Sequence, residues 1–307
     1  MIERVCVAGA GAIGSLFAGH LASKCEVYVL VRREAHARAL NKSHLNVSSE
    51  SGYSGVRVAA TTEPADLPNV DLVIVACKGT DLETVATRLE GHFSGALVMP
   101  IQNGLGAEQI VRAHGDWPLI SAVTFMSGTK HSDTHVEYIL ETPTWLGPYE
   151  DTPMETVEEI AELIRSSGLQ AEAFADLRPA QWSKLIFNAT VNAVAALTGL
   201  RHDFHFADES TPAGLGHLVH ELVDEGKRVA AAVGVELRED PWEMNVLATR
   251  RGSAHYPSML EDVDARRPTE IELITGSLIR EAERVGVPVP LHTALYRLIK
   301  AKEAGYA

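Results

Sequence analysis

The sequence has little cysteine, few aromatic residues and a deficit of positive charge. Its 307 residues include three cysteines and 6% aromatic residues, and the formal net charge at pH 7 is −14. A chain this acidic repels the phosphates of nucleic acids and of anionic membranes, so neither is an expected partner. Cys6, Cys25 and Cys77 lack the spacing of a metal site, and we predict unpaired thiols in a reducing cytoplasm.

Long hydrophobic runs are also absent. No apolar stretch of the sequence reaches the roughly 20 residues that span a bilayer. The apolar start does not resemble a signal peptide, because it contains Glu3, lacks a basic first region and is interrupted by glycines. The length suits two domains, each with room for a buried core.

A glycine-rich segment follows a short apolar run at 5–8. It consists of Gly9, Ala10, Gly11, Ala12, Ile13 and Gly14, and a helical pattern begins at once. Strand, glycine turn and helix in this order form the phosphate-binding start of a dinucleotide fold. Gly9 would permit the tight turn, Gly11 the approach of a pyrophosphate, and Gly14 the packing of helix on strand. A plain glycine-rich turn in an unrelated α/β protein is the alternative.

The first half of the chain alternates between strand and helix patterns. Apolar runs predict strands at 5–8, 27–31, 72–77, 97–101 and 119–125, short strands within 44–61 joined at a Gly52–Gly55 turn, more strands within 135–147, and a helix at 80–90. This alternation is typical of a doubly wound, mostly parallel sheet.

After about residue 175 the pattern changes to long helical periodicities. We predict helices at 177–197, 213–233, 256–265, 269–285 and 292–304, separated by glycines and prolines. The expected fold is α/β, with an N-terminal Rossmann-type doubly wound sheet and a C-terminal all-helical domain. The boundaries would be 1–175 for the nucleotide domain and 176–307 for the substrate and catalytic domain, with the cleft between them as the default active site.

The end of the second predicted strand indicates which dinucleotide binds. NAD-binding chains usually carry an acidic side chain there, which bonds the ribose 2′-hydroxyl. Here the strand ends in Val31, Arg32 and Arg33, and an arginine suits the additional 2′-phosphate of NADP. Glu34 comes late for the ribose role and suits the start of the next helix. We therefore predict NADPH/NADP as the cofactor. The alternative is that the two arginines are merely solvated and contact no 2′-phosphate.

Segment 181–192 combines an apolar helical pattern with a polar stripe. Lys184, Asn188 and Asn192 recur every four residues and so share one helix face about 12 Å long. Burying a lysine and two asparagines costs several kcal/mol unless a partner bonds them. A polar substrate would satisfy all three. A solvent-facing stripe, or amides that bond another helix, is the alternative.

Together these motifs resemble the ketopantoate reductase (2-dehydropantoate 2-reductase) family. The matching stretches are GAGAIG, VRR, CKGTD, IQNGLG, WSKLIFNATVN and SMLEDVDARRPTEIELITG, and they extend over nearly the whole chain. The last two are the more specific, because glycine loops occur in many families. The resemblance implies a Rossmann domain joined to a helical domain, NADPH as hydride donor and a branched 2-oxo acid as substrate.

The resemblance also implies which residues meet the cofactor. Residues 9–14 would hold the pyrophosphate, and Arg32 would meet the 2′-phosphate. Lys78, just after the apolar strand at 72–77, would lie near the adenosine ribose and the nicotinamide. Asn103 would sit where nicotinamide and substrate meet.

The remaining implied roles concern the substrate. Lys184 would be the general acid, Asn188 and Asn192 would bind the hydroxyl and carboxylate region, Ser258 would hold the carboxylate, and Glu270 would complete the network. Hydride transfer to a ketone leaves negative charge on oxygen, which a lysine ammonium can stabilise and protonate. Burial and other cations should lower the pKa of Lys184, and Glu270 should oppose that shift.

Three of these residues also have structural interpretations. Lys78 can be interpreted as a surface lysine at a strand end, Ser258 as a helix cap, and Glu270 as an acidic residue in the first turn of a helix. Two features depart from the family pattern, namely segment 125–146 and Thr275, where the family often has asparagine. Both bear on the choice of substrate more than on hydride chemistry.

Three functional hypotheses follow. The first is reduction of ketopantoate to pantoate, a step toward pantothenate and coenzyme A. The second is a reductase of the same mechanism with another 2-oxo acid or carbonyl substrate, and the third is a protein that senses NADP without turnover. A retained pair of Lys184 and Glu270 favours either enzyme over the sensor.

Metal and oligomer signals are weak. Two H-x-x-H pairs occur among the 13 histidines, but no cysteine or carboxylate set completes a ligand shell, so no metal is expected. Apolar helices in the C-terminal half offer enough surface for a homodimer, and the sequence carries no specific signal for one.

Overall fold

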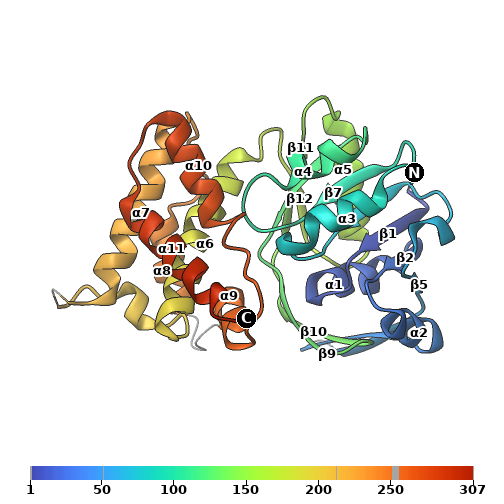
Figure 1. The fold of residues 1–307 in the computed structure, drawn as a ribbon. Coiled ribbons are helices and arrows are strands. Elements are labelled where there is room, and N and C mark those ends of the chain that lie inside the picture. Colours follow the sequence, from blue (N-terminus) through green and yellow to red (C-terminus); the bar gives the residue numbers. More distant parts are fainter. Residues whose placement is uncertain (1, 51, 212, 251–255, 307) are drawn as a thin grey trace. The chain divides into compact units, whose positions relative to one another are not determined.

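The computed structural model describes residues 2–50, 52–211, 213–250 and 256–306 (Figure 1). Its contacts divide the chain into two units. The first contains the residues up to Gln102 together with Ala107–Leu177, and the second contains Asn103–Gly106 together with the chain from Arg178 onward. A four-residue segment of the N-terminal half therefore folds with the C-terminal half. Each unit has its own hydrophobic core.

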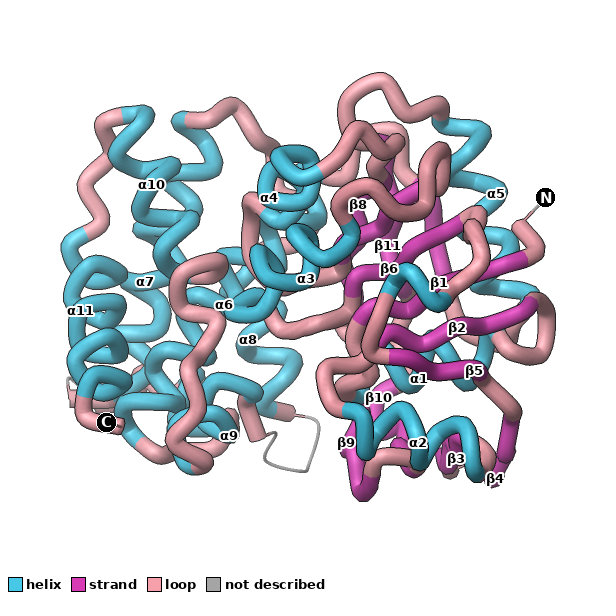
Figure 2. The backbone as a smooth tube through the Cα atoms, turned by 45° about the vertical axis from the view of Figure 1, so that its right-hand side comes forward, coloured by secondary structure: helices cyan, strands magenta, loops and turns pink. Residues whose placement is uncertain are grey.

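A five-stranded parallel sheet forms the centre of the first unit, with strand order β5-β2-β1-β6-β7 (Figure 2). Its strands are β1 (Arg4–Ala8), β2 (Glu26–Leu30), β5 (Ala59–Thr61), β6 (Leu72–Val75) and β7 (Leu97–Pro100). β6 is buried at every position and β1 at all but its first, as expected for central parallel strands.

Two smaller sheets complete the strands of this unit. One has the order β12-β11-β8, made of β8 (Ile120–Thr124), β11 (Thr144–Pro148) and β12 (Ala171–Ala173). The other has the order β4-β3-β10-β9, made of β3 (Leu45–Ser49), β4 (Gly52–Val56), β9 (Ser127–Ser132) and β10 (His135–Leu140). The predicted Gly52–Gly55 turn is wrong, because both glycines lie within β4 and pair with β3.

Helices connect the strands of the first unit. They are α1 (Ala12–Leu21), α2 (Glu34–Lys42), α3 (Leu82–Leu89), α4 (Ala107–His114) and α5 (Met154–Ser166), with short 3₁₀ turns η1 (Pro64–Asp66) and η2 (Gly79–Asp81). α2 begins at Glu34, as the sequence indicated. The predictions did not include α4 and α5, which bury only one face and contain no continuous apolar run. The alternation of β1, α1, β2 and α2 confirms the Rossmann-type fold.

Helices are the main regular elements of the second unit in the part of the chain that the structure describes. Its helices are α6 (Arg178–Thr198), α7 (Leu215–Ala232), α8 (Pro241–Thr249), α9 (Ser258–Asp264), α10 (Thr275–Val285) and α11 (Pro290–Ala304), with the 3₁₀ turn η3 (Phe204–Ala207). α6 is central, because α7, α8, α9, α10 and α11 all pack against it. α8 was not predicted, and α10 begins six residues later than expected because hydrogen-bonded turns occupy 270–274.

No helix among the described residues combines the length and apolarity that crossing a membrane requires.

Candidate functional site

The turn between β1 and α1 needs glycine at two positions for the protein's own packing. Gly9 has a φ of +107°, and its amide donates to the carbonyl of Leu30 at 2.9 Å. A Cβ on Gly9 would lie 2.6 Å from the amide nitrogen of Cys77. A Cβ on Gly14 would lie 1.9 Å from the carbonyl oxygen of Gly9 and 3.0 Å from Cβ of Ala76. Either side chain would therefore push the turn off the sheet.

Gly11 differs from both, because packing does not explain it. Its φ is −70°, and a Cβ at this position would have no heavy atom within 4 Å. α1 starts directly after Gly11 with no side-chain cap and no acidic residue in its first turn. Free N–H groups and the positive end of the helix dipole thus remain for an anion. The open turn fits a pyrophosphate that approaches the backbone closely.

Basic residues follow the two strands that flank β1. Arg32 comes after β2, its side chain is 79% exposed, and it pairs with Asp81 at 3.4 Å. Lys78 is an exposed residue between β6 and η2, which agrees with its interpretation as a lysine near a strand end. The order β2-β1-β6 brings these strand ends beside the glycine turn. Open α/β sheets bind ligands at this edge, where the strand order reverses.

The polar stripe of α6 belongs to a hydrogen-bonded cluster in the second unit. Lys184 Nζ donates to Asn103 Oδ1 at 2.8 Å, and Asn103 Nδ2 donates to Glu270 Oε2 at 3.1 Å. Since a lysine can only donate, the amide of Asn103 must turn its oxygen to Lys184 and its nitrogen to Glu270. Asn103 therefore connects the ammonium to the carboxylate.

A second glycine explains how Asn103 reaches this cluster. Gly104 has a φ of +97°, and a Cβ there would lie 1.7 Å from the carbonyl oxygen of Leu273. The next amide, that of Leu105, donates to the same oxygen at 3.0 Å. Segment Asn103–Gly106 is thus held against the turns that precede α10, which also carry Glu270.

The electrostatics of Lys184 follow from these surroundings. Burial lowers its pKa to about 8, while the nearby carboxylate of Glu270 acts in the opposite direction. Among the residues that the structure describes, no other cation contributes to this shift, although we expected other cations to lower the pKa as well. A lysine with this pKa keeps its proton at neutral pH and releases it more readily than an exposed one.

The two asparagines of the stripe are buried, so the solvent-facing alternative is wrong. Asn188 is 8% exposed, and its amide lies 3.5 Å from Asn103 Oδ1, at the outer limit of a hydrogen bond. Asn192 is 7% exposed, and its side chain forms no hydrogen bond with any residue that the structure describes. A buried amide without a partner suits a site completed by a polar ligand.

Ser258 and Glu270 occupy positions that exclude their structural interpretations. Ser258 is the exposed first residue of α9, which packs against α6, and it makes no capping hydrogen bond. Glu270 lies in the turns before α10 and not in the first turn of a helix. Both side chains remain predicted site residues.

Two residues near the predicted cofactor site were not anticipated. Lys130 on β9 donates from Nζ to the carbonyl of Ala10 in the glycine turn, and it lies 3.2 Å from His36 Nε2. In the sequence, the segment around Lys130 was noted only because it departs from the family pattern, and no role was predicted for Lys130. Gln102 Nε2 donates to the carbonyls of Val75 and Cys77 at 2.8 and 2.9 Å, which joins the ends of β6 and β7.

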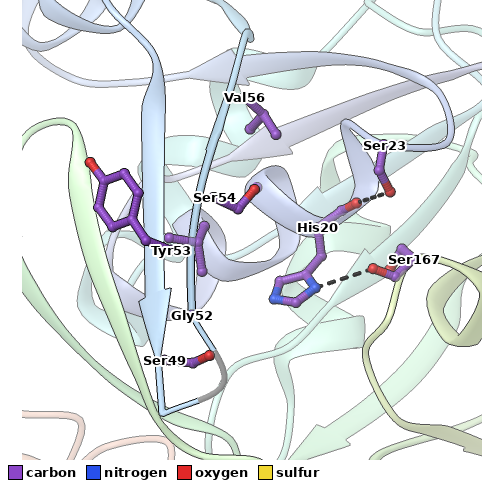
Figure 3. Close-up of a pocket in the computed structure, with 10 residues that line it drawn as sticks. His20, Ser23, Ser49, Gly52, Tyr53, Ser54, Val56 and Ser167 are labelled. Carbon is purple, nitrogen blue, oxygen red and sulfur yellow. Dashed lines mark hydrogen bonds between the residues drawn. The ribbon is translucent and has the colours of Figure 1, made fainter.

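A pocket of about 350 Å³ lies elsewhere in the first unit (Figure 3). Its lining comes from the end of α1, from β3 and β4, and from Ser167 after α5. His20 is its one histidine, and Nδ1 of this ring lies 3.2 Å from the carbonyl of Ser167. None of the predicted site residues lines this pocket, so it is separate from the predicted cofactor and substrate residues.

Metal ligands do not cluster in the described part of the chain, where no group of three or more histidine, cysteine or acidic residues could hold an ion. Cys6, Cys25 and Cys77 all lie in the described part of the chain and form no disulfide bond there.

Comparisons with known proteins agree with the motifs. Residues 5–151 match the family model described as ketopantoate reductase PanE/ApbA, and residues 176–303 match the model of its C-terminal region. The chain is 29% identical over 301 residues to a 2-dehydropantoate 2-reductase of Pyrococcus horikoshii, with 98% of each chain covered. It is 28% identical over 304 residues to the Archaeoglobus fulgidus protein of the same name, with 99% of each covered.

Solved structures have the same fold. A PanE/ApbA family ketopantoate reductase from Ralstonia eutropha superposes with a TM-score of 0.89 at 25% identity, over 99% of both chains. A D-mandelate dehydrogenase solved with NADH and anilino(oxo)acetate also gives a TM-score of 0.89 over 99% of both chains, and at 22% identity it supports the fold alone. With both family models matched along one chain, this protein belongs to the ketopantoate reductase PanE/ApbA family, which is a family of oxidoreductases.

Proposed function

We propose that this protein reduces 2-dehydropantoate (ketopantoate) to pantoate with NADPH, a step of pantothenate and coenzyme A biosynthesis. The observation that carries the proposal is the bonded series of Lys184, Asn103 and Glu270 in the second unit. It joins a proton donor to a carboxylate through an amide on the segment that follows β7. Family membership and the names of the relatives support the choice of substrate.

The first unit would hold the cofactor, whose nicotinamide supplies the hydride. The glycine turn and the uncapped start of α1 suit its pyrophosphate. Arg32 at the end of β2, where NAD-binding chains usually have an acid, favours the 2′-phosphate of NADPH. Its surface ion pair with Asp81 contributes little energy and can give way to a phosphate.

Lys184 would act as the general acid. A carbonyl oxygen that gains negative charge is stabilised by an ammonium within hydrogen-bond distance and then takes its proton. Burial lowers the pKa of Lys184 and so makes its proton easier to release. Glu270 raises that pKa and so favours the charged lysine before the proton is transferred. Asn103 would orient Nζ, because its Oδ1 accepts one of the three ammonium hydrogens.

The polar groups around α6 would bind the rest of the 2-oxo acid. Asn188 and Asn192 present buried amides on the face that carries Lys184, and Ser258 starts the helix packed against α6. We assign the hydroxyl and carboxylate of the substrate to these three side chains. Ala10, Ala12, Ile13 and Lys78 would complete the cofactor contacts on the other unit.

A reductase of a different 2-oxo acid is the second candidate. Thr275 is fully buried, and its hydroxyl has no hydrogen-bond partner among the described residues. The longer asparagine that is frequent here in the family would reach other groups, so the substrate preference can differ. A sensor without turnover is disfavoured, because Lys184 and Glu270 are both present and connected.

The deciding experiment follows the absorbance of NADPH in the presence of ketopantoate, 2-oxoisovalerate and pyruvate. We expect ketopantoate to give the highest kcat/KM by at least tenfold. A 2-oxo acid that exceeds ketopantoate would establish the second candidate. No turnover with any of them would leave the sensor as the explanation.

A further inference from the structure

We propose that Lys130 is a further cofactor-binding residue of this chain and contacts the 2′-phosphate of NADP. The inference rests on the proposed function, and it extends the 2′-phosphate site from Arg32 to a lysine on β9. The resemblance to the family implied no role for this residue.

The position of Lys130 beside the glycine turn is the first argument. β9 packs along α1 (Figures 1 and 2), and Lys130 Nζ donates to the carbonyl of Ala10. Ala10 immediately precedes Gly11, the glycine whose missing side chain no protein packing explains. A partly buried ammonium therefore stands next to the surface that suits a nucleotide phosphate.

The second argument is that Lys130 lies on the side of the glycine turn that faces α2. Besides the carbonyl of Ala10, Lys130 contacts His36 of α2, the helix that follows β2. β1 and β2 pair in register, with Ala8 opposite Leu30, so the segments that leave them are neighbours. Dinucleotide folds recognise the adenosine ribose at the end of the second strand. The contact with α2 thus favours the 2′-phosphate over the pyrophosphate.

Charge balance is the third argument. Arg32 pairs with Asp81, and Arg33 pairs with Asp133 at 2.6 Å. Lys130 instead bonds one uncharged partner, the carbonyl of Ala10, lies 3.2 Å from Nε2 of His36, and forms no ion pair with any residue that the structure describes. A phosphate is the kind of partner that would complete its coordination.

Burial, more than the neighbouring charges, favours the neutral form of the His36 imidazole. Burial lowers the pKa of His36, and the charge of Lys130 lowers it further, while Asp133 opposes both. Nε2 of His36 lies 2.9 Å from the carbonyl oxygen of Asp133, which can only accept, so this nitrogen carries the hydrogen and cannot accept one from Lys130, whose Nζ lies 3.2 Å away. Burial also lowers the pKa of Lys130 to about 8, with Asp133 raising it and Arg33 lowering it. An added phosphate would stabilise the ammonium.

Calorimetric titration of the full-length protein with adenosine 2′,5′-bisphosphate and with AMP tests the role without using activity. The two ligands differ only in the 2′-phosphate. We expect Lys130→Met to weaken binding of the bisphosphate by about tenfold or more, the scale of a lost charge-assisted hydrogen bond, and that of AMP by less than about twofold. Lys130→Arg should retain most of the affinity.

Two further variants separate binding from folding. Lys130→Gln keeps a donor for the carbonyl of Ala10 and removes the charge, so it should repeat the selective loss. Lys42→Met removes an exposed lysine from the end of α2 and should bind both ligands as the wild type does. Thermal unfolding of every variant provides a check on folding.

Other outcomes refute the assignment in distinguishable ways. If the wild type prefers the bisphosphate and Lys130→Gln loses affinity for both ligands equally, or for neither, Lys130 does not contact the 2′-phosphate, whereas NADP specificity stands. If the wild type binds AMP as tightly as the bisphosphate, the NADPH preference of the proposed function fails as well.

Discussion

A lysine can donate a proton near neutral pH only when its surroundings weaken its hold on that proton. Lys184 meets this condition, because burial lowers its pKa to about 8. Lys227 on α7 is another lysine of the same unit, and its ammonium pairs with the carboxylate of Asp240 at 2.6 Å, away from the predicted site residues.

Replacing Lys184 with methionine should lower kcat by about 10²- to 10⁴-fold, the usual scale of general acid catalysis. The affinity for NADPH should change little, because the contacts of Lys184 lie in the second unit. Steady-state kinetics and a fluorescence titration of NADPH measure the two effects. Lys227→Met is the matched control and should retain most of its kcat. An unchanged rate in Lys184→Met would exclude the lysine as the acid.

The pH dependence should respond to Glu270. Reduction needs protonated Lys184, so kcat/KM should be constant at low pH and fall tenfold per unit above a pKa of about 8. Because Glu270 raises this pKa, Glu270→Gln should move the alkaline limb to lower pH. Glu272→Gln is the control, as that carboxylate pairs with Tyr296 and Lys300. A limb that stays in place or moves upward in Glu270→Gln would contradict the assignment.

At the scale of elements, the segment Asn103–Gly106 decides how the candidate site is assembled. It follows β7, whose end is joined to β6 through Gln102, yet it packs with the second unit. The close approach of Gly104 to Leu273 makes this possible. One tight turn therefore brings an amide from the first half of the sequence to a lysine 81 residues later.

Gly104→Ala should detach this segment from the turns before α10 and displace Asn103. We expect kcat to fall by at least about tenfold while the affinity for AMP stays near the wild-type value. Gly95→Ala is a suitable control, because Gly95 also has a positive φ, of +77°, but its Cβ would meet no atom within 4 Å. That variant shares the backbone strain of about 1–2 kcal/mol without the collision. Kinetics and thermal unfolding of both would reveal the difference, and equal loss of kcat in the two would refute the explanation.

The spacing of polar and apolar residues predicted some elements well and others poorly. The polar stripe on α6 was visible because four-residue spacing places side chains on one face. The start of α10 was predicted too early, since the apolar pattern at 271–274 continues into the helix although hydrogen-bonded turns form there. Glu270 consequently reaches Asn103 from a turn, which periodicity does not anticipate.

At the scale of the whole molecule, the charge opposes the proposed ligands. A net charge of −14 repels a dinucleotide phosphate and a 2-oxo acid alike. Local cations must therefore supply the attraction, and Arg32, Lys130 and Lys184 are the groups we assign to it. Binding should weaken as salt screens these contacts.

NADPH should stabilise the folded protein more than NADH does. A ligand at 100 times its Kd that binds only the native state adds about 2.7 kcal/mol to the free energy of unfolding. At equal concentrations NADH should add less, because it lacks the 2′-phosphate. Thermal or urea unfolding with each nucleotide measures the difference, and Arg32→Ala should reduce it. Equal stabilisation of the wild type by both nucleotides would contradict NADPH specificity.

The sequence by itself determined the strand–helix alternation of the first half, the helical character of the second half, the glycine turn, the basic residues after β2 and the polar face of α6, because each depends on residues close together in the chain. Only the tertiary structure decided that Asn103 links Lys184 to Glu270, and that Lys130 stands beside Ala10. Those contacts join residues 81, 167 and 120 positions apart, and they depend on backbone approaches and buried partners that local periodicity does not encode.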